Sequence, residues 1–379
     1  MFPNIPYLSW IEGRPEAVAH DLASSDLRPA TLPTEPVPVR LREHADPPED
    51  VTLDALLADA YDVEVDEVLV TAGATNANAL AFAVAAEAPE TVTSAIEETA
   101  DDGPDGDADD DEWTSRVLVE KPGYEPHTAT PRGFGVIVDQ FQRPEGILDA
   151  VRVDAAIQDA TALVVVSDRH NPTGRRTNRD ALRESVAAAT DAGARVLVDE
   201  VYAPYATAPE PGPFGAPTAA ELDGTVVTGS LTKFLGFGGL RIGWLVADAE
   251  FVSAAERVQR HFPGIAEPSR QLARRALASH DALAAPQRER IKRNHDLLAD
   301  FVADRPRLAG VVYDGVTYAL VQHDDLDGDE LAERALDAGV LVVPGRFFNR
   351  PEYVRISLGR PTEQAGAALD ALANVLDDV

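Results

Sequence analysis

The sequence has no cysteine and very little lysine. Without cysteine there can be no disulfide bond, thiol catalysis or cysteine-ligated metal site, which fits a reducing cytosol. Lysine occurs only at positions 121, 233 and 292, against thirty arginines. Lysine has therefore been almost removed from this chain, and each lysine that remains is of interest.

Positive charge as a whole is scarce. Acidic residues number 65 against 33 lysines and arginines, so the formal net charge is −32. Such an excess of negative charge opposes binding to nucleic acid or to an anionic membrane surface. Together with the abundant alanine, it is typical of proteins that work in molar salt, and we interpret it as an adaptation to the solvent.

Long apolar runs are also missing. None approaches the length of a membrane span, and Met1–Tyr7 lacks the basic region and apolar core of a signal peptide. We therefore expect a cytoplasmic protein that does not contact a membrane. At 379 residues, 45% of them hydrophobic, the chain can form a main domain and a smaller one.

Short apolar strands alternate with helical segments through most of the chain. This rhythm predicts an α/β protein with a mostly parallel sheet covered on both faces. Helices are expected over Val51–Tyr61, with Thr52 as a possible cap, from the turn at 72–76 to about Ala88, over Thr177–Asp191 and Phe251–His261, and over Ala266–Asp304 with a bend near Pro286. The expected strands are Val68–Thr71, Arg116–Glu120, Gly135–Val138, Leu163–Val166, Arg195–Asp199, Thr225–Thr228 and Gly243–Val246.

The last part of the chain changes character and predicts a small α+β domain. We expect paired strands at Val311–Tyr313 and Tyr318–Val321, a helix at Asp329–Ala338, strands at Leu341–Val343 and Tyr353–Ser357, and a terminal helix from Thr362. The predicted division is an N-terminal arm at 1–48, a large domain at 49–265 and a small domain at 266–379.

An acidic segment at about 89–113 interrupts the α/β pattern. Its run of aspartates and glutamates cannot form a core, which indicates a solvated surface insertion. A calcium-binding loop is the alternative interpretation, although the spacing lacks the order of an EF-hand.

The segment Thr228–Trp244 contains one of the three lysines. Lys233 lies in a glycine-rich turn, with Ser230 three residues before it and Arg241 eight residues after it. This pattern indicates a reactive amine beside an anion site, and a surface loop with a stray cation is the alternative.

Other motifs follow predicted strands, whose carboxyl ends meet at one edge of a parallel sheet, where ligands bind. A glycine turn precedes the helix that begins near Ala74, a geometry that presents free N–H groups to an anion. The remaining motifs are Pro122-Gly123-Tyr124, His170-Asn171-Pro172-Thr173-Gly174 and Asp199-Glu200-Val201-Tyr202, with Arg355-Ile356-Ser357 near the C-terminus.

In this order the motifs resemble those of the class I/II aminotransferases, which are fold-type I pyridoxal-phosphate enzymes. The resemblance extends from about Asp50 to Leu358. It implies a large domain with a mostly parallel, seven-stranded sheet flanked by helices, a small α+β domain, a homodimer and pyridoxal 5′-phosphate as cofactor.

The resemblance also implies roles for the residues around the cofactor ring. Lys233 would hold the cofactor as a Schiff base and move a proton during the reaction. Asp199 would keep the pyridine nitrogen protonated, Asn171 and Tyr202 would donate hydrogen bonds to the phenolic oxygen, and Tyr124 would stack on the ring.

The phosphate and the substrate have their own implied ligands. Ala74 and Thr75 at the helix start, the Ser230 hydroxyl and a bidentate Arg241 would bind the phosphate.

Arg355 would bind the substrate carboxylate, with Asn171 nearby, and Ser24 and Ser25 of the arm would contact the substrate. No metal is expected.

Three departures from the family pattern bear on side-chain specificity and on the type of reaction. The residues before Asn171, Ser167-Asp168-Arg169-His170, are more polar than is usual in the family. The tyrosine that many relatives direct at the phosphate of the neighbouring subunit is missing, with Asp46-Pro47-Pro48 near its expected place. His127 stands where relatives often have a second aromatic residue.

The expected activity is transfer of an α-amino group between an amino acid and a 2-oxo acid by a ping-pong mechanism. Another reaction on the same cofactor, by a decarboxylase, a β-lyase or an oxidase, is the alternative. A DNA-binding regulator built on this fold is disfavoured, because only about fifty residues precede the fold and the charge is −32.

Overall fold

The computed structural model describes residues 2–29, 35–87 and 115–377. The acidic segment at 89–113, with its alternative as a calcium loop, lies outside these ranges. Within them, no helix combines the length and the apolar character needed to cross a bilayer.

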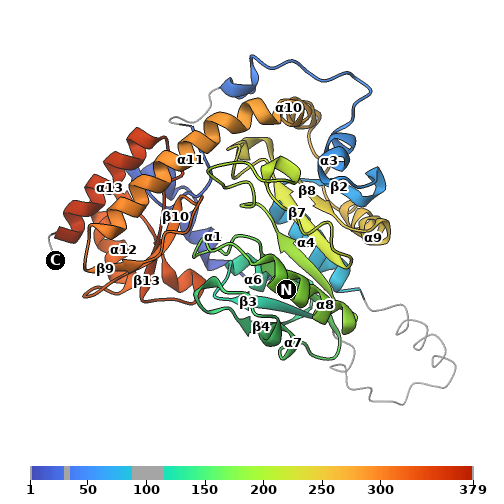
Figure 1. The fold of residues 1–379 in the computed structure, drawn as a ribbon, viewed down its shortest axis with the longest axis horizontal. Coiled ribbons are helices and arrows are strands. Elements are labelled where there is room, and N and C mark those ends of the chain that lie inside the picture. The colour runs from blue at the N-terminus through green and yellow to red at the C-terminus, as the bar shows by residue number, and fades with distance from the viewer. Residues whose placement is uncertain (1, 30–34, 88–114, 378–379) are drawn as a thin grey trace.

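A seven-stranded sheet forms the centre of the molecule (Figure 1). Its strands are β2 (Val68–Thr71), β3 (Arg116–Lys121), β4 (Ile137–Gln142), β5 (Thr161–Ser167), β6 (Arg195–Asp199), β7 (Thr225–Ser230) and β8 (Gly243–Val246). They lie in the order β2-β8-β7-β6-β5-β3-β4, and only β8 runs antiparallel to its neighbours. The register places Ser167 opposite Asp199 and Asp199 opposite Thr228, so β5 and β6 end together and β7 continues two residues further, to Ser230.

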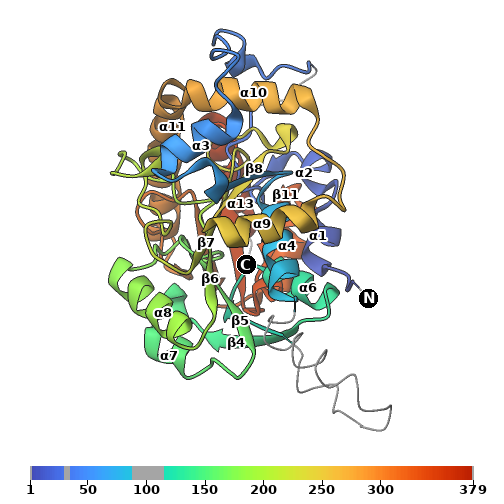
Figure 2. The same cartoon turned by 90° about the vertical axis from the view of Figure 1, so that its right-hand side faces the viewer.

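Helices cover both faces of this sheet (Figure 2), because alternate strand residues point to opposite faces and both sets are apolar. Leu197 packs in the core with α4 (Ala74–Ala85) and α9 (Ala249–Gln259), whereas Val196 and Val198 pack in the core that contains α3 (Leu53–Tyr61) and α8 (Arg179–Asp191). The fold class expected from the sequence is therefore confirmed.

Several local signals acted as predicted. The Thr52 hydroxyl accepts from the Ala55 N–H at 3.1 Å and caps α3. Gly193 adopts φ +79° just after α8, as expected for a residue that closes a helix. The predicted strand at Gly135–Val138 instead starts at Ile137 and continues to Gln142, because β4 pairs with the whole of β3.

A smaller antiparallel sheet, in the order β12-β13-β10-β9, packs beside the large one. Its strands are β9 (Leu308–Gly310), β10 (Tyr318–His323), β12 (Val343–Pro344) and β13 (Tyr353–Ser357), and α11 (His280–Ala303), α12 (Gly328–Asp337) and α13 (Thr362–Asp377) surround it. A separate parallel pair joins β1 (His20–Asp21) to β11 (Val340–Leu341) and brings the N-terminal segment alongside. The other helices are α1 (Pro6–Ile11), α2 (Arg14–Ala17), α6 (Glu125–Gly133), α7 (Ala150–Asp154) and α10 (Glu267–Ala278), with 3-10 turns at η1 (Val39–Leu41), η2 (Val65–Glu67), η3 (Pro144–Gly146), η4 (Pro213–Gly215), η5 (Gly238–Leu240) and η6 (Gly345–Phe348).

Three expectations for this half of the chain were wrong. The strand predicted at Leu341–Val343 is two short strands, because β11 pairs with β1 and β12 pairs with β13 in the small sheet. The long helix breaks at Ser279, between α10 and α11, and continues through Pro286. Packing sets this break, since the His280 ring at the start of α11 lies 4.9 Å from the Phe214 ring. The strand predicted at Val311–Tyr313 is instead β9, because Val311 is 57% exposed and the Tyr313 ring contacts the Arg175 guanidinium.

Candidate active site

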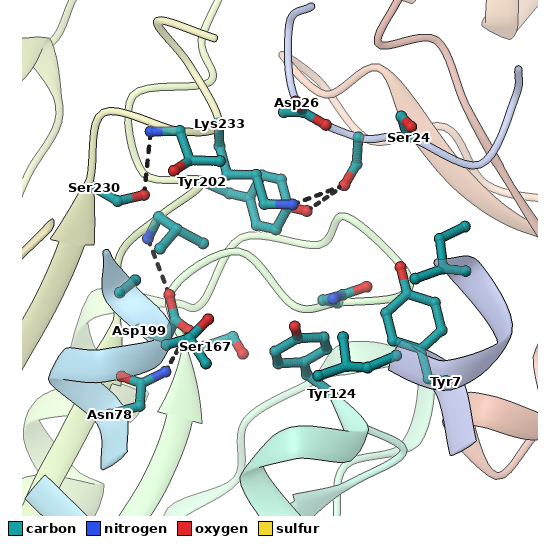
Figure 3. A pocket seen from close by; sticks show the side chains of 18 of the residues that line it. Tyr7, Ser24, Asp26, Asn78, Tyr124, Ser167, Asp199, Tyr202, Ser230 and Lys233 are labelled. Carbon is teal, nitrogen blue, oxygen red and sulfur yellow. Dashed lines mark hydrogen bonds between the residues drawn. The ribbon is translucent and has the colours of Figure 1, made fainter. Parts of the chain in front are cut away.

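A cavity of about 330 Å³ lies where the carboxyl ends of the large-sheet strands face the small sheet. Figure 3 shows side chains from both sides converging on it. Its lining includes every site residue that the sequence predicted: Ser24, Ser25, Ala74, Thr75, Tyr124, Asn171, Asp199, Tyr202, Ser230, Lys233, Arg241 and Arg355. Residues far apart in the sequence are thus brought together in one place.

Asp199 lies at the base of the cavity, at the end of β6, and is 7% exposed. Its Oδ2 is 3.2 Å from His127 Nε2 and accepts from Asn78 Nδ2 at 3.3 Å, while Oδ1 accepts from the Val201 N–H at 3.1 Å. Burial alone would raise the pKa of Asp199, but these contacts outweigh it and hold the pKa below its ordinary value. Asp199 is therefore an anion that faces a cavity.

Lys233 follows the end of β7 and enters the cavity from the opposite side. Its Nζ donates to Ser25 Oγ at 3.3 Å and lies 5.4 Å from the centre of the Tyr202 ring, and Ser25 Oγ and Tyr202 Oη are 2.6 Å apart. Burial would lower the pKa of Lys233, but Tyr202 and Asp26 outweigh it and raise the pKa. The Lys233 amine is thus a cation.

The start of α4 forms an anion cradle with Arg241. No side chain caps this helix, so the first-turn N–H groups at Ala74 and Thr75 face the cavity. Gly73, at φ +91°, has no side chain, and a Cβ there would come within 2.9 Å of Arg241 Nη2. A Cβ at Gly243 would come within 2.5 Å of the Ala74 nitrogen. The two glycines keep the cradle open.

Ser230 and Arg241 complete this end of the cavity. The Ser230 hydroxyl accepts from the Thr232 N–H at 3.3 Å, which leaves its proton for a ligand. Arg241 is exposed, adopts φ +52° and donates from Nη2 to the Ala72 carbonyl oxygen at 3.1 Å.

Arg355 occupies the other end, on β13, and is 2% exposed. Nη1 donates to Asn171 Oδ1 at 2.7 Å and Nη2 to the Ala23 carbonyl oxygen at 3.1 Å, while Nε has no hydrogen-bond partner among the described residues. Because the Asn171 carbonyl oxygen is taken by Arg355, its amide N–H groups are left to donate into the cavity.

Tyr124 lies between these two ends, just before α6. Its ring is perpendicular to that of His127, with centres 5.3 Å apart, and burial raises its pKa. His127, which the sequence marked only as a departure from the family pattern, thus packs against Tyr124 and contacts Asp199 through Nε2.

Sequence reasoning did not predict the other lining residues, among them Asn78, Tyr7 and Thr232. Asn78 lies one turn into α4, where Thr228 Oγ1 donates to its Oδ1 at 2.7 Å and so directs its amide nitrogen towards Asp199. Tyr7 of α1 faces the cavity from the N-terminus, and Thr232 lines it beside Lys233. The position of Asn78 on the helix after the glycine turn was a usable signal, whereas no local pattern marks Tyr7.

Solved structures share this fold. A PLP-dependent aminotransferase from Streptococcus suis superposes with a TM-score of 0.81 at 21% identity, covering 100% of this chain and 98% of that one. Aspartate aminotransferase from Thermus thermophilus with maleate superposes with a TM-score of 0.77 at 23% identity, covering 99% of this chain and 97% of that one. At these identities, the likeness concerns the fold alone.

Sequence comparison gives relatives with several names. Histidinol-phosphate aminotransferase of Brevibacillus brevis is 26% identical over 65% of this chain and 66% of its own length. Capreomycidine synthase of Streptomyces vinaceus is 29% identical over 69% of this chain and 68% of its own length. Histidinol-phosphate aminotransferase of Halobacterium salinarum is 30% identical over 68% and 70%. The matched part of this chain thus spans about two thirds of the length of these relatives.

The chain also matches the sequence pattern of a whole family. The pattern described as "Aminotransferase class I and II" matches residues 112–372, more than half of the chain. It includes β3, β5, β6, β7 and β13, whose ends carry most of the cavity side chains. The chain belongs to the class I and II aminotransferases, a family of pyridoxal-phosphate enzymes.

Proposed function

We propose that this protein is an aminotransferase, which moves an α-amino group between an amino acid and a 2-oxo acid. The observation that carries the proposal is that the Lys233 amine, the Asp199 carboxylate and the Arg355 guanidinium line one cavity. The three groups supply a nucleophile and proton carrier, a fixed anion and a carboxylate receptor.

The residues present fit pyridoxal phosphate. The uncapped start of α4, kept open by Gly73 beside Arg241, suits a phosphate group. Asp199, kept ionised by His127, suits a protonated ring nitrogen, and Tyr124 offers an aromatic face between the two ends. When bound, the cofactor supplies an aldehyde that condenses with amines and a ring that withdraws electrons.

Each residue then has a defined task. Lys233 carries the proton that leaves the substrate Cα, and it must lose its charge before it can accept one. Asp199 would hold the ring nitrogen of a bound cofactor in its protonated form through a charge-assisted hydrogen bond. Asn171 and Tyr202 would donate to the phenolic oxygen of a bound cofactor. Ser25 is hydrogen-bonded to Tyr202 and Lys233 and orients these two side chains.

Arg355 binds the substrate carboxylate with its free donor edge. Its contacts with Asn171 and the Ala23 carbonyl fix the plane of the guanidinium before substrate arrives, so little side-chain freedom is lost on binding. Ser24 lies beside this position and is held by its N–H, which donates to Asp21 Oδ1 at 3.0 Å.

We extend the proposal to the setting of the enzyme. The charge of −32 supports work at high salt, and we propose the cytoplasm as the compartment because the sequence lacks cysteine. By analogy with the family, we propose a homodimer, with an arm at 1–48, a large domain at 49–265 and a small domain at 266–379.

A half-reaction tests the activity. The protein loaded with pyridoxal phosphate, in molar salt, should lose its visible absorbance when amino donors are added without an acceptor, and should release one 2-oxo acid per site. Lys233→Ala should bind the cofactor without covalent attachment under borohydride and should lose turnover by about 10⁴-fold or more. Release of CO2 or ammonia in place of the 2-oxo acid would refute transamination in favour of a decarboxylase or a lyase.

A further inference from the structure

A second pocket, of about 460 Å³, is lined by residues on either side of Asn171 in the sequence. Three segments form it: the turn that follows β5, the loop that follows β6 and the segment that leads into β10. The lining residues are Arg169, Arg175, Arg176, Ala206, Thr207, Ala208, Glu210, Tyr313 and Asp314. The cavity that contains Lys233 shares no lining residue with this pocket, so the two are separate sites.

The backbone of the turn brings its arginines together. An antiparallel bridge pairs Arg169 with Arg176, and inside it the His170 N–H donates to the Arg175 carbonyl oxygen at 2.8 Å. Gly174, at φ +83°, supplies the left-handed conformation that this tight return needs. The turn thus presents three guanidinium groups to one pocket.

Positive charge is in excess on this lining, in a chain whose formal net charge is −32. Three arginines face two acidic residues, Glu210 and Asp314, and Glu210 forms an ion pair with Arg176. Burial, and then the charge of Arg176, lower the pKa of Arg169, although Asp168 and Asp314 act in the opposite direction. The guanidinium groups of Arg169 and Arg176 therefore repel each other, and an anion in the pocket would offset this repulsion.

The arginines are held in place and keep donors for a ligand. Arg169 is 4% exposed and donates from Nη1 to the Asp314 carbonyl oxygen at 3.1 Å, while its Nη2 makes no hydrogen bond to the described residues. Arg175 donates to Tyr313 Oη from Nε at 2.9 Å and from Nη2 at 2.6 Å, and lies 4.7 Å from the centre of that ring. Because the Tyr313 oxygen accepts these bonds, its own proton is left to donate. Two guanidinium groups and one hydroxyl can thus donate to the same bound group.

We propose that this pocket is a phosphate-binding site, which takes the dianion of inorganic phosphate or of a small phosphate ester. A phosphate group offers acceptor oxygens in several directions, and planar guanidinium groups bind such oxygens in pairs. A carboxylate has two oxygens in one plane and would leave part of the donors unused. The proposal assigns Arg169, Arg175 and Tyr313 as ligands, and it does not depend on the function proposed for the other cavity.

Equilibrium binding of phosphate tests the site. The protein is first loaded with pyridoxal phosphate, whose own phosphate group would occupy the anion cradle at α4, and is then dialysed against radiolabelled inorganic phosphate in molar potassium chloride. At this salt concentration the attraction between exposed charges is largely screened, so binding that persists reports a specific site. We expect saturable binding of about one phosphate per chain and a melting temperature that rises with phosphate concentration.

Competition identifies the source of the phosphate group. If glycerol 3-phosphate displaces the label at a lower concentration than unlabelled phosphate does, an ester is the preferred ligand, and the reverse order identifies inorganic phosphate. Acetate should not compete in either case, because it has a single charge and two oxygens.

Variants at the pocket locate the binding. Arg175→Met and Tyr313→Phe, both at partly exposed positions, should each weaken phosphate binding by about tenfold or more. Ala208 is an exposed lining residue, so Ala208→Asp adds a carboxylate to the pocket without disturbing the core and should also weaken binding. Ala208→Asn is its matched control, since it has nearly the same shape without the charge and should leave the affinity close to that of the parent. Arg183→Met removes an exposed cation that pairs with Asp180 outside the pocket, and should likewise change little.

Arg241→Met distinguishes this pocket from the anion cradle. If pyridoxal phosphate does not load, inorganic phosphate could bind in the cradle instead, and Arg241→Met would then abolish binding while Arg175→Met would not. That pattern, a lack of saturable binding, or equal affinities for Ala208→Asp and Ala208→Asn would overturn the inference. The expected pattern of binding in a protein that converts no amino donor would keep the phosphate site and remove the aminotransferase proposal.

Discussion

Arg143 and Glu120 form an ion pair that is entirely removed from solvent, directly behind the cavity. Arg143 also donates to the carbonyl oxygens of Gly146 and Ser167, each at 3.1 Å, and to Thr177 Oγ1 at 2.6 Å. Glu120 accepts from the Ser167 hydroxyl at 2.7 Å. The pair thus joins the carboxyl ends of β3, β4 and β5, and the loops that follow β3 and β5 carry Tyr124 and Asn171.

Breaking this pair should strongly destabilise the fold. Arg143→Met leaves the Glu120 carboxylate buried without its partner, and we expect the free energy of unfolding to fall by about 3–5 kcal/mol in urea titrations. Arg116→Met is the matched control, because Arg116 pairs with Asp139 across the same two strands at 3.1 Å but is partly exposed. Its loss should be below about 1 kcal/mol. Equal losses in the two variants would contradict the role of the buried pair.

Gly73→Ala should weaken cofactor binding. The new Cβ would come within 2.9 Å of Arg241 Nη2 and would displace the guanidinium from the anion cradle. Gly193→Ala is the control, because Gly193 also has a positive φ, +79°, but nothing lies within 4 Å of the place that its Cβ would take. Both variants should lose about 1 kcal/mol or more of stability, through backbone strain. Only Gly73→Ala should raise the Kd for pyridoxal phosphate, measured by absorbance titration, and an unchanged Kd would rule out its place in the cradle.

Glu200 should make stability fall as pH rises. Burial, and then the nearby Asp168, raise the pKa of this carboxyl to about 8. The hydrogen bonds from the Ala219 N–H and the Thr218 hydroxyl lower this pKa, but by less. Its pKa in the unfolded chain is about 4.3, so between these values the folded state binds more protons. This contribution to stability is complete below the unfolded pKa and is lost as pH rises through the folded pKa.

Glu200→Gln should flatten this dependence. The slope that it removes is at most about 1.4 kcal/mol per pH unit between pH 5 and 8, measured by urea unfolding at each pH. Glu221→Gln, at a carboxyl that is 56% exposed, should leave the slope as it is. A parent protein with no decline in stability over this range would show that Glu200 is ionised in the fold.

His127→Phe should alter the pH dependence of activity. His127 is the main counterweight to the burial of Asp199, so its removal should raise the pKa of that carboxyl. The acid limb of the kcat/KM profile should then move to higher pH, with a lower plateau, because less of Asp199 is ionised at a given pH. A lower plateau with an unmoved acid limb would mean that His127 supports the site only by packing.

The strands and the motif loops could be predicted from the sequence because their signals are local. The runs Val68–Val70 and Val196–Val198 are apolar throughout, as strands buried on both faces must be, and polar and turn residues follow them. The order of these loops along a parallel sheet then places Asp199, Asn171 and Lys233 at one edge. These three side chains meet in the cavity because of the sheet topology, more than because of any detail of side-chain packing.

Contacts between distant segments could not be predicted in this way. Tyr7 meets Glu125 and Arg355 across more than a hundred residues, and nothing near Tyr7 in the sequence indicates either partner. The break at Ser279 depends similarly on Phe214, which lies in another segment. The apolar run Val311–Tyr313 satisfied the local pattern for a strand, but the Tyr313 hydroxyl accepts a hydrogen bond from Arg175, outside the sheet.

The contact between Arg355 and Asn171 has a consequence for the order of events during synthesis. Asn171, the anion cradle and Lys233 all precede Arg355 in the chain, so a ribosome completes the part of the cavity proposed to bind the cofactor about a hundred residues before the proposed carboxylate receptor. Because domains generally fold as units from the N-terminal side, a nascent chain could acquire its cofactor ligands before it can bind any substrate. The proposed reaction becomes possible only after β13, which carries Arg355, has been synthesised.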